Sequence, residues 1–133
     1  MLVENALQVK LVADLTSLTA SRVYYVKAPQ DVTAPYLIIQ KISQARDVVT
    51  SGKRYVQARM QISCFASTYA SIKAIGALIQ TSLDKFSGLM GGGLWVVNTT
   101  YENETDLGYD DDLKLYGLAV DYMLLYELAI TNT

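Results

Sequence analysis

Ten residues in the middle of the chain alternate strictly between two kinds of side chain. The apolar members are Val56, Ala58, Met60, Ile62 and Cys64. The intervening members are Tyr55, Gln57, Arg59, Gln61 and Ser63. Successive side chains of a β-strand point to opposite faces, so this period of two predicts a strand with one buried and one polar face. Such a strand has to pack its apolar face against other elements, and a sheet is therefore the frame of the fold.

Two other stretches have the periodicity of amphipathic helices. One apolar stripe consists of Val3, Leu7, Leu11, Leu15 and Leu18, and the other of Ile72, Ile75, Ile79, Leu83 and Phe86. Spacings of three and four residues place each stripe on one helix face. Ser67 or Thr68 is suited to cap the second helix, and Gly88 is suited to end it in a left-handed conformation.

Strand patterns also cover residues 22–26, 36–42, 94–100 and 115–127. In the last of these, one face is apolar and carries Tyr116, Leu118, Val120, Tyr122, Leu124 and Tyr126. The order α, β, β, β, α, β, β lacks the regular alternation of a doubly wound parallel sheet. We therefore expect an α+β fold: an antiparallel or mixed β-sheet of four to five strands, two helices packed on one face, and a long β-hairpin arm.

The bulk properties limit the classes of protein. The 133 residues fit a single domain, 1-133. A formal net charge of -2 provides no basic footprint for nucleic acid. No apolar run reaches the ~18 residues of a membrane span, and the N-terminal residues lack the layout of a signal peptide. We expect no membrane partner, and the single cysteine favours a reducing compartment or a particle indifferent to cysteine.

The residues offer little for catalysis. The chain has no histidine, which excludes a Ser-His-Asp triad, a Cys-His dyad and histidine metal ligands. Cys64 falls on the apolar face of its strand and is expected to be buried and structural. An EF-hand loop starting at Glu102 would need glycine at Leu107 and glutamate at Leu113. No catalytic residue, cofactor or metal site is therefore expected, although a looser cation site among the carboxylates stays open.

Six carboxylates crowd into eleven residues near the C-terminal strand. They are Glu102, Glu104, Asp106, Asp110, Asp111 and Asp112. Like charges at such spacing repel each other by ~1 kcal/mol per close pair even in water. We expect an acidic loop from Glu102 to Asp112 at a surface that meets a partner, with a plainly solvated loop as the alternative.

A second candidate surface is the predicted arm from Ser43 to Arg54, whose turn signal is Ser51-Gly52. Its tip places charged side chains around an adjacent pair of valines. The candidate interface residues are Arg46, Asp47, Val48, Val49, Lys53 and Arg54. A tip that meets only solvent has little reason to carry two adjacent valines, so we expect a subunit or partner interface here.

Several segments, in this order, together resemble one protein family. They are Arg22-Val23-Tyr24, Ala28-Pro29-Gln30, residues 34–43, residues 59–69, Tyr101-Glu102-Asn103-Glu104-Thr105-Asp106-Leu107, residues 116–122 and Tyr126-Glu127. The chain is similar in these segments to the tail completion, or tail terminator, proteins of long-tailed bacteriophages. One departure is Gly108-Tyr109, where the family pattern has Tyr-Glu soon after the Asp-Leu pair.

The resemblance implies a structural virion protein. Its copies would form a homo-oligomeric ring, usually a hexamer, that caps the tail tube protein, ends tail polymerisation and presents a joining surface to the head–tail connector protein. DNA would pass through the lumen without specific binding, and the acidic loop would face this lumen or a basic neighbour. The expected location is the virion tail or neck, and the host cytoplasm during assembly. A cytosolic regulatory or ligand-binding α+β domain stays open, as does an enzyme subunit completed by a partner.

Overall fold

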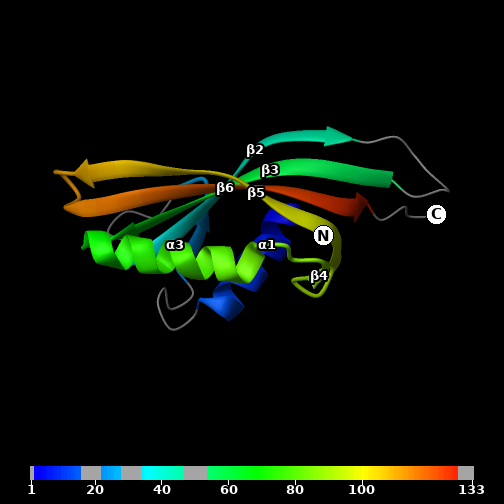
Figure 1. Ribbon diagram of the computed structural model, residues 1–133, viewed down its shortest axis with the longest axis horizontal. Helices are drawn as coiled ribbons and strands as arrows, with labels where there is room; N and C mark the ends of the chain where they lie inside the picture. Colours follow the sequence, from blue (N-terminus) through cyan, green and yellow to red (C-terminus); the bar gives the residue numbers. More distant parts are fainter. Residues whose placement is uncertain (1, 16–21, 28–33, 47–53, 129–133) are drawn as a thin grey trace.

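The computed structural model describes residues 2–15, 22–27, 34–46 and 54–128. The helices are α1 (Val3–Asp14) and α3 (Tyr69–Leu83). The strands are β1 (Val23–Tyr25), β2 (Tyr36–Arg46), β3 (Arg54–Ala66), β4 (Gly88–Met90), β5 (Leu94–Asp110) and β6 (Leu115–Leu128). Figure 1 shows α1 and α3 on the same side of the sheet. The expected α+β fold with two helices on one face is therefore confirmed.

The strands of the described residues form one mixed six-stranded sheet in the order β1-β2-β3-β6-β5-β4. β1 is parallel to β2, and every other neighbouring pair is antiparallel. The expected number of four to five strands is wrong because β4 was not foreseen. β4 pairs only three residues with β5, and three residues are too few to show a period of two.

The strand that alternates in the sequence lies in the middle of this sheet. β3 pairs with β2 on one side, and on the other side with β6 from Arg54↔Leu128 to Ala66↔Tyr116. All five apolar members of its alternation are buried. The predicted apolar face of β6 is buried as well, except that Tyr116 is half-buried and packs against the core. The central pair, β3 and β6, thus forms the sheet side of the hydrophobic core.

The two helices pack their apolar stripes against this face of the sheet. Buried stripe residues are Val3, Leu7, Leu11 and Leu15 beside or within α1, and Ile72, Ile75, Ile79 and Leu83 in α3. Burying one such side chain stabilises the fold by ~1.5–3 kcal/mol. Thr68 caps α3, since its hydroxyl accepts a hydrogen bond from the Ser71 backbone N–H at 3.1 Å. The predicted position Leu18 lies outside the described residues.

The chain leaves α3 differently from the prediction. The left-handed residue after the helix is Lys85, with a φ of 57°, whereas Gly88 begins β4. The glycine turn at 91–93 then joins β4 to β5. A Cβ at Gly91 would lie 2.7 Å from the Ala6 Cα, so this turn packs closely against α1.

The base of the predicted hairpin arm belongs to the sheet. β2 and β3 remain paired as far as Arg46↔Val56, and β6 pairs with the same part of β3. The strand pattern in the sequence covers residues 36–42, and β2 continues beyond it to Arg46, into the segment predicted as the arm. Residues 47–53 lie outside the described residues, so the arm beyond the sheet stays a prediction.

Candidate assembly surfaces

The acidic segment is not a loop but mostly a strand, which corrects the prediction. β5 continues to Asp110, and a turn at 111–114 joins it to β6. The pairing reaches Asp110↔Leu115, with register shifts near residues 97, 102 and 107. Because β6 supplies partners along nearly the whole length of β5, the strand does not need an apolar period of its own.

Asp106 is held against α3. Its carboxylate accepts a hydrogen bond from the Lys73 Nζ at 2.8 Å and one from the Tyr69 hydroxyl at 3.0 Å. These hydrogen bonds, that of Lys73 first, lower the pKa of Asp106, and the same contact with Asp106 raises the pKa of Lys73. Asp106 therefore fastens the exposed part of β5 to the start of α3.

Two further carboxylates have local partners. The Gln80 side-chain amide donates a hydrogen bond to Glu104 at 3.1 Å, which is a second link between α3 and β5. Asp110 accepts hydrogen bonds from the backbone N–H groups of Asp112 and Leu113, at 2.9 and 3.1 Å. Asp110 thus shapes the β5–β6 turn in the way that aspartate commonly does.

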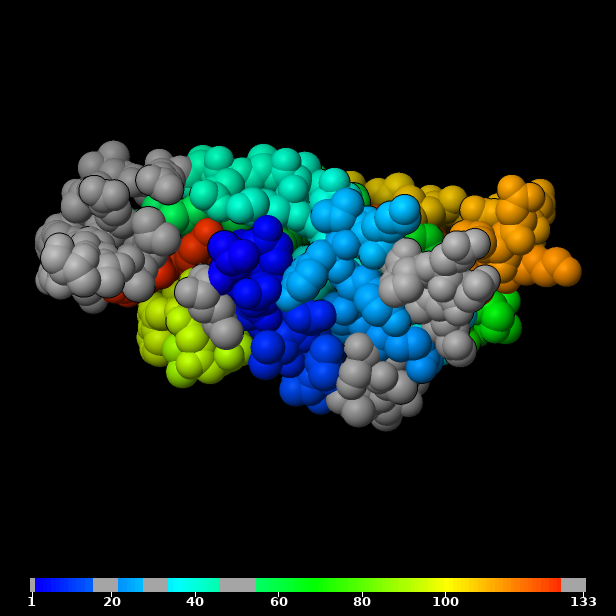
Figure 2. Space-filling view, turned by 180° about the vertical axis from the view of Figure 1, so that it is seen from behind, coloured from blue at the N-terminus to red at the C-terminus, as the bar shows by residue number. Residues whose placement is uncertain are grey.

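The remaining carboxylates are Glu102, Asp111 and Asp112. All three are exposed, and none makes a side-chain hydrogen bond or ion pair within the described residues. The described chain also contains no group of three or more side chains that could hold a metal ion. The acidic turn, which we define as residues 110–112, forms a projection at one end of the molecule, drawn in orange in Figure 2.

The predicted hairpin interface is described only at its base. Arg46 and Arg54 are the last residue of β2 and the first of β3. Asp47, Val48, Val49 and Lys53 lie outside the described residues. Figure 1 shows that the C-terminal end of β2 and the N-terminal end of β3 lie at the end of the molecule opposite the β5–β6 turn. The two candidate surfaces are therefore not brought together within one copy of the chain.

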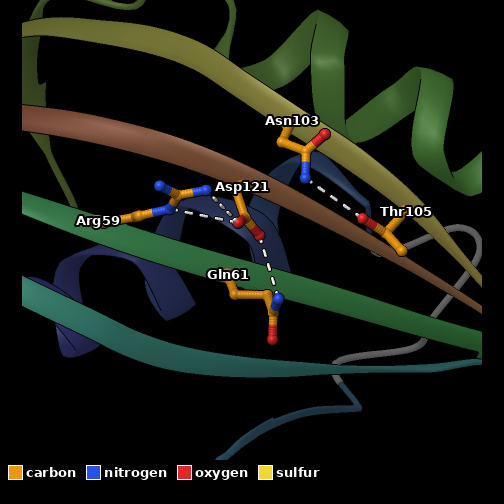
Figure 3. Close-up of polar contacts among 5 residues, drawn as sticks. All are labelled: Arg59, Gln61, Asn103, Thr105 and Asp121. Atoms are coloured by element: carbon orange, nitrogen blue, oxygen red, sulfur yellow. Dashed lines mark hydrogen bonds and ion pairs between the residues drawn. The ribbon is translucent and has the colours of Figure 1, made fainter.

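A polar cluster on the helix-free face of the sheet was not predicted. The Arg59 guanidinium donates hydrogen bonds to Asp121 at 2.9 and 3.3 Å, and the Gln61 amide donates one at 3.2 Å (Figure 3). The Asn103 amide donates to the Thr105 hydroxyl nearby, at 3.3 Å. Asp121 is only 7% exposed although neither of the two described helices covers this face. Its neighbours on β3 and β5 shield it.

Part of this cluster could have been predicted from the sequence. Alternation places Arg59 and Gln61 on the polar face of β3 and Asp121 off the apolar face of β6. Their contact also requires the pairing Gln61↔Asp121, which joins residues 60 positions apart. Local periodicity carries no information about such a partner.

Two open clefts lie at the margins of the sheet. One, of about 470 Å³, is lined by Asp84, Lys85, Asn98, Thr99, Thr100 and Tyr101. The other, of about 280 Å³, is lined by Leu2, Glu4, Asn5, Tyr25, Val26, Ile39 and Lys41. The first cleft lies beside β5, and the second lies beside β1 and β2, near the opposite edge of the sheet.

Cys64 is buried, as predicted. Burial raises the pKa of its thiol to about 12, which keeps it protonated and unreactive at neutral pH. Neither described helix, of 12 and 15 residues, is long and apolar enough to cross a membrane.

Residues 6–127 match the family described as tail completion protein gp17. Because the match covers most of the chain, the protein belongs to this family. It is a structural protein of the tail of a phage virion. The predicted family and its virion location are confirmed. No curated protein matches the chain.

The fold also recurs in a solved structure described as "Virion of native gene transfer agent (GTA) particle". One of its chains shares 16% sequence identity with this protein and superimposes with a TM-score of 0.72. The likeness covers 95% of each chain. At this identity the likeness shows a shared fold.

Proposed function

We propose that copies of this chain form a closed ring, hexameric by resemblance, that caps the tail tube and ends its polymerisation. The opposite side of the ring would offer the joining surface for the head–tail connector. The observation that carries this proposal is the family match over residues 6–127. The ring would assemble in the host cytoplasm and remain at the neck end of the tail.

The charge of the molecule supports a role as a conduit. DNA binding is dominated by contacts between basic side chains and phosphates. This chain has a net charge of -2, and its exposed acidic turn carries three carboxylates. A ring of such subunits would let DNA pass without holding it.

The arrangement of the two candidate surfaces supports a ring with two different rims. The acidic turn lies at one end of the molecule, and the strands leading to the Arg46–Arg54 hairpin run toward the other (Figure 1). When copies stand side by side in a closed ring, unlike ends give the ring two unlike rims, one for the tail tube and one for the connector. The acidic segment would then meet a basic neighbour, with the lumen as its alternative location.

Mass measurement in solution, with and without the tail tube protein, tests the ring, and electron microscopy shows whether it is closed. We expect a discrete oligomer and closed rings. A protein that stays monomeric both in solution and in assembled particles would refute the proposal. A monomer with a bound small molecule would instead support the ligand-binding alternative.

The hairpin has a separate test. Replacing Val48 and Val49 with serine removes the apolar pair from the predicted interface. We expect weaker ring or particle assembly with an unchanged thermal unfolding midpoint. The matched control is Thr50→Ser, a small change in the same segment. Wild-type assembly of the double variant would remove the hairpin tip from the interface.

A further inference from the structure

The outer edge of β5 is open along most of its length. β4 pairs with β5 only from Leu94 to Val96. From Val97 to Asp110 no strand of the described residues pairs with this edge, although β6 pairs with the inner edge. About half of the backbone N–H and C=O groups in this fourteen-residue stretch point outward without a partner strand, and they are a template for another strand.

The outer edge of β2, on the opposite side of the sheet, is open in the same way. β1 pairs with β2 only from Leu37 to Ile39, and the Val26 N–H donates a last hydrogen bond to the Ile39 carbonyl. Between Gln40 and Arg46, β2 has no outer partner among the parts of the chain that the structure describes. The sheet thus has two open edges, and each begins where a short strand stops.

The two open edges carry opposite charge. From Val97 to Glu104 the β5 edge contains Glu102 and Glu104 and no lysine or arginine. The β2 edge contains Lys41 and Arg46 and no acidic residue from Gln40 to Arg46. Charge complementarity of this kind favours contact between unlike edges and disfavours contact between like edges.

Exposed apolar side chains accompany the charges. Ile42 on β2 and Val97 and Tyr101 on β5 are exposed in the single chain. An edge that is protected against pairing usually carries charge or proline, and exposed apolar residues weaken that protection. Pairing with a second strand would cover these side chains as well as the backbone.

The strand directions and the register of the β2 and β5 edges are also compatible with pairing between two copies. β2, β3, β6 and β5 are successively antiparallel, so β2 and β5 run in opposite directions. A rotation about an axis along the strands would keep these directions and make the joint antiparallel, the slightly more stable kind of pairing. The pairs Lys41↔Met60, Met60↔Tyr122 and Tyr122↔Tyr101 place Lys41 level with Tyr101. The same rotation would bring Lys41 of one copy beside Tyr101 and Glu102 of the next.

We infer that the open β5 edge, from Val97 to about Glu104, binds the open β2 edge, Gln40 to Arg46, of a second copy of this chain. The contact continues the sheet from one subunit into the next, in antiparallel pairing with opposite charges across the joint. It rests on the ring proposed above and specifies how neighbouring subunits join.

Cysteine cross-linking tests the joint directly, because the one native cysteine is buried. Ile42→Cys is combined in turn with Asn98→Cys, Thr100→Cys or Glu102→Cys in the full chain. A disulfide requires Cα atoms within about 7 Å, so it reports on register. Under mild oxidation, at least one double variant should give a ladder of covalent multimers. Each single variant alone should give none, and two mixed single variants should give dimers only.

A charge exchange tests the complementarity. Lys41→Glu and Glu102→Lys should each lower the fraction of protein in rings at least tenfold at low salt. The double variant K41E/E102K should restore ring formation. The control Lys10→Glu changes charge equally, but on α1 and away from both open edges, and should assemble normally.

The outcomes separate the joint from the ring itself. Wild-type rings with no cross-linked ladder and no effect of Lys41→Glu would overturn the edge pairing and leave the ring intact. Wild-type protein that forms no ring with or without the tail tube protein would overturn both. A ladder together with rescue by the double exchange would establish the joint.

Discussion

The two faces of the sheet follow different rules. On the face covered by α1 and α3, β3 and β6 present a continuous set of buried apolar side chains. On the helix-free face, the same two strands present Arg59, Gln61 and Asp121, which bond to one another. The first face is shaped by the need to exclude water. The second keeps its polar groups paired while remaining accessible.

The difference indicates which face contributes most to folding. Apolar burial supplies most of the favourable free energy of a domain of this size. Exposed polar groups contribute little to it, and so can be chosen for contacts with other molecules. Changes on the covered face should therefore destabilise the fold strongly, whereas changes at exposed positions of the open face, outside the Asp121 cluster, should have small effects on stability.

The largest expected effect is on the covered face. Ile62→Ala removes a fully buried side chain and should lower the free energy of unfolding by ~2–5 kcal/mol. Gln57→Ala, on the exposed side of the same strand, should change it by less than ~0.5 kcal/mol. Denaturant titration of both variants makes the comparison. Equal costs would mean that the two faces do not differ as described.

The next effect concerns the polar cluster on the open face. Arg59→Met leaves the nearly buried Asp121 carboxylate with Gln61 as its remaining partner and should cost ~1–3 kcal/mol. Adding Asp121→Asn should recover part of this loss, because no unpaired charge then remains. The four-member double-mutant cycle measures the coupling. A cost as small as that of Gln57→Ala would show that the cluster is not structural.

A smaller, pH-dependent effect is expected at the link between β5 and α3. Hydrogen bonds from Lys73 and Tyr69 lower the pKa of Asp106 in the folded state. Asp106 therefore stabilises the fold above its unfolded value of about 3.9, and this contribution is lost as the pH falls through the lower folded value.

Lys73→Met should remove this acid-sensitive contribution. The difference in unfolding midpoint between wild type and variant should be present at pH 7 and shrink as the pH falls below about 4. Lys85→Met removes an equal charge from the turn between α3 and β4, away from the Lys73–Asp106 contact, and serves as the control. A difference that is independent of pH would argue against the ion pair.

The smallest effect on folding is expected at the acidic turn. Changing Asp110, Asp111 and Asp112 to asparagine should alter the free energy of unfolding by less than ~0.5 kcal/mol, since an asparagine in place of Asp110 retains an acceptor oxygen for the turn. Ring assembly should nevertheless weaken, and high salt should weaken the wild-type ring. Normal assembly with altered DNA retention would place the turn at the lumen. Normal assembly and infection would show a merely solvated turn.

The sequence was informative wherever an apolar period existed. Both helices, the central strand β3 and the last strand β6 were predicted from such periods, and their apolar residues form the core. The start of α3 at Tyr69 follows the predicted cap Thr68. These features depend on side chains close together in the chain.

The second half of β5 could not be predicted in this way. Beyond Thr100 its residues are mostly polar or acidic, and they form a strand because β6 pairs with them and α3 holds Glu104 and Asp106. The Arg59–Asp121 contact was missed for a related reason, since it joins residues 62 positions apart. In both cases the missing information concerns a distant partner.

The central place of β6 has a consequence for how the subunit is made. β6 is the last strand along the described chain, yet it joins the β1–β2–β3 part of the sheet to the β5–β4 part. During synthesis from the N-terminus, these two parts exist before the strand that unites them. A nascent or truncated chain lacks β6, the strand that fixes the two outer edges of the sheet relative to each other. The two outer edges therefore reach their final relative positions only after β6 has been translated.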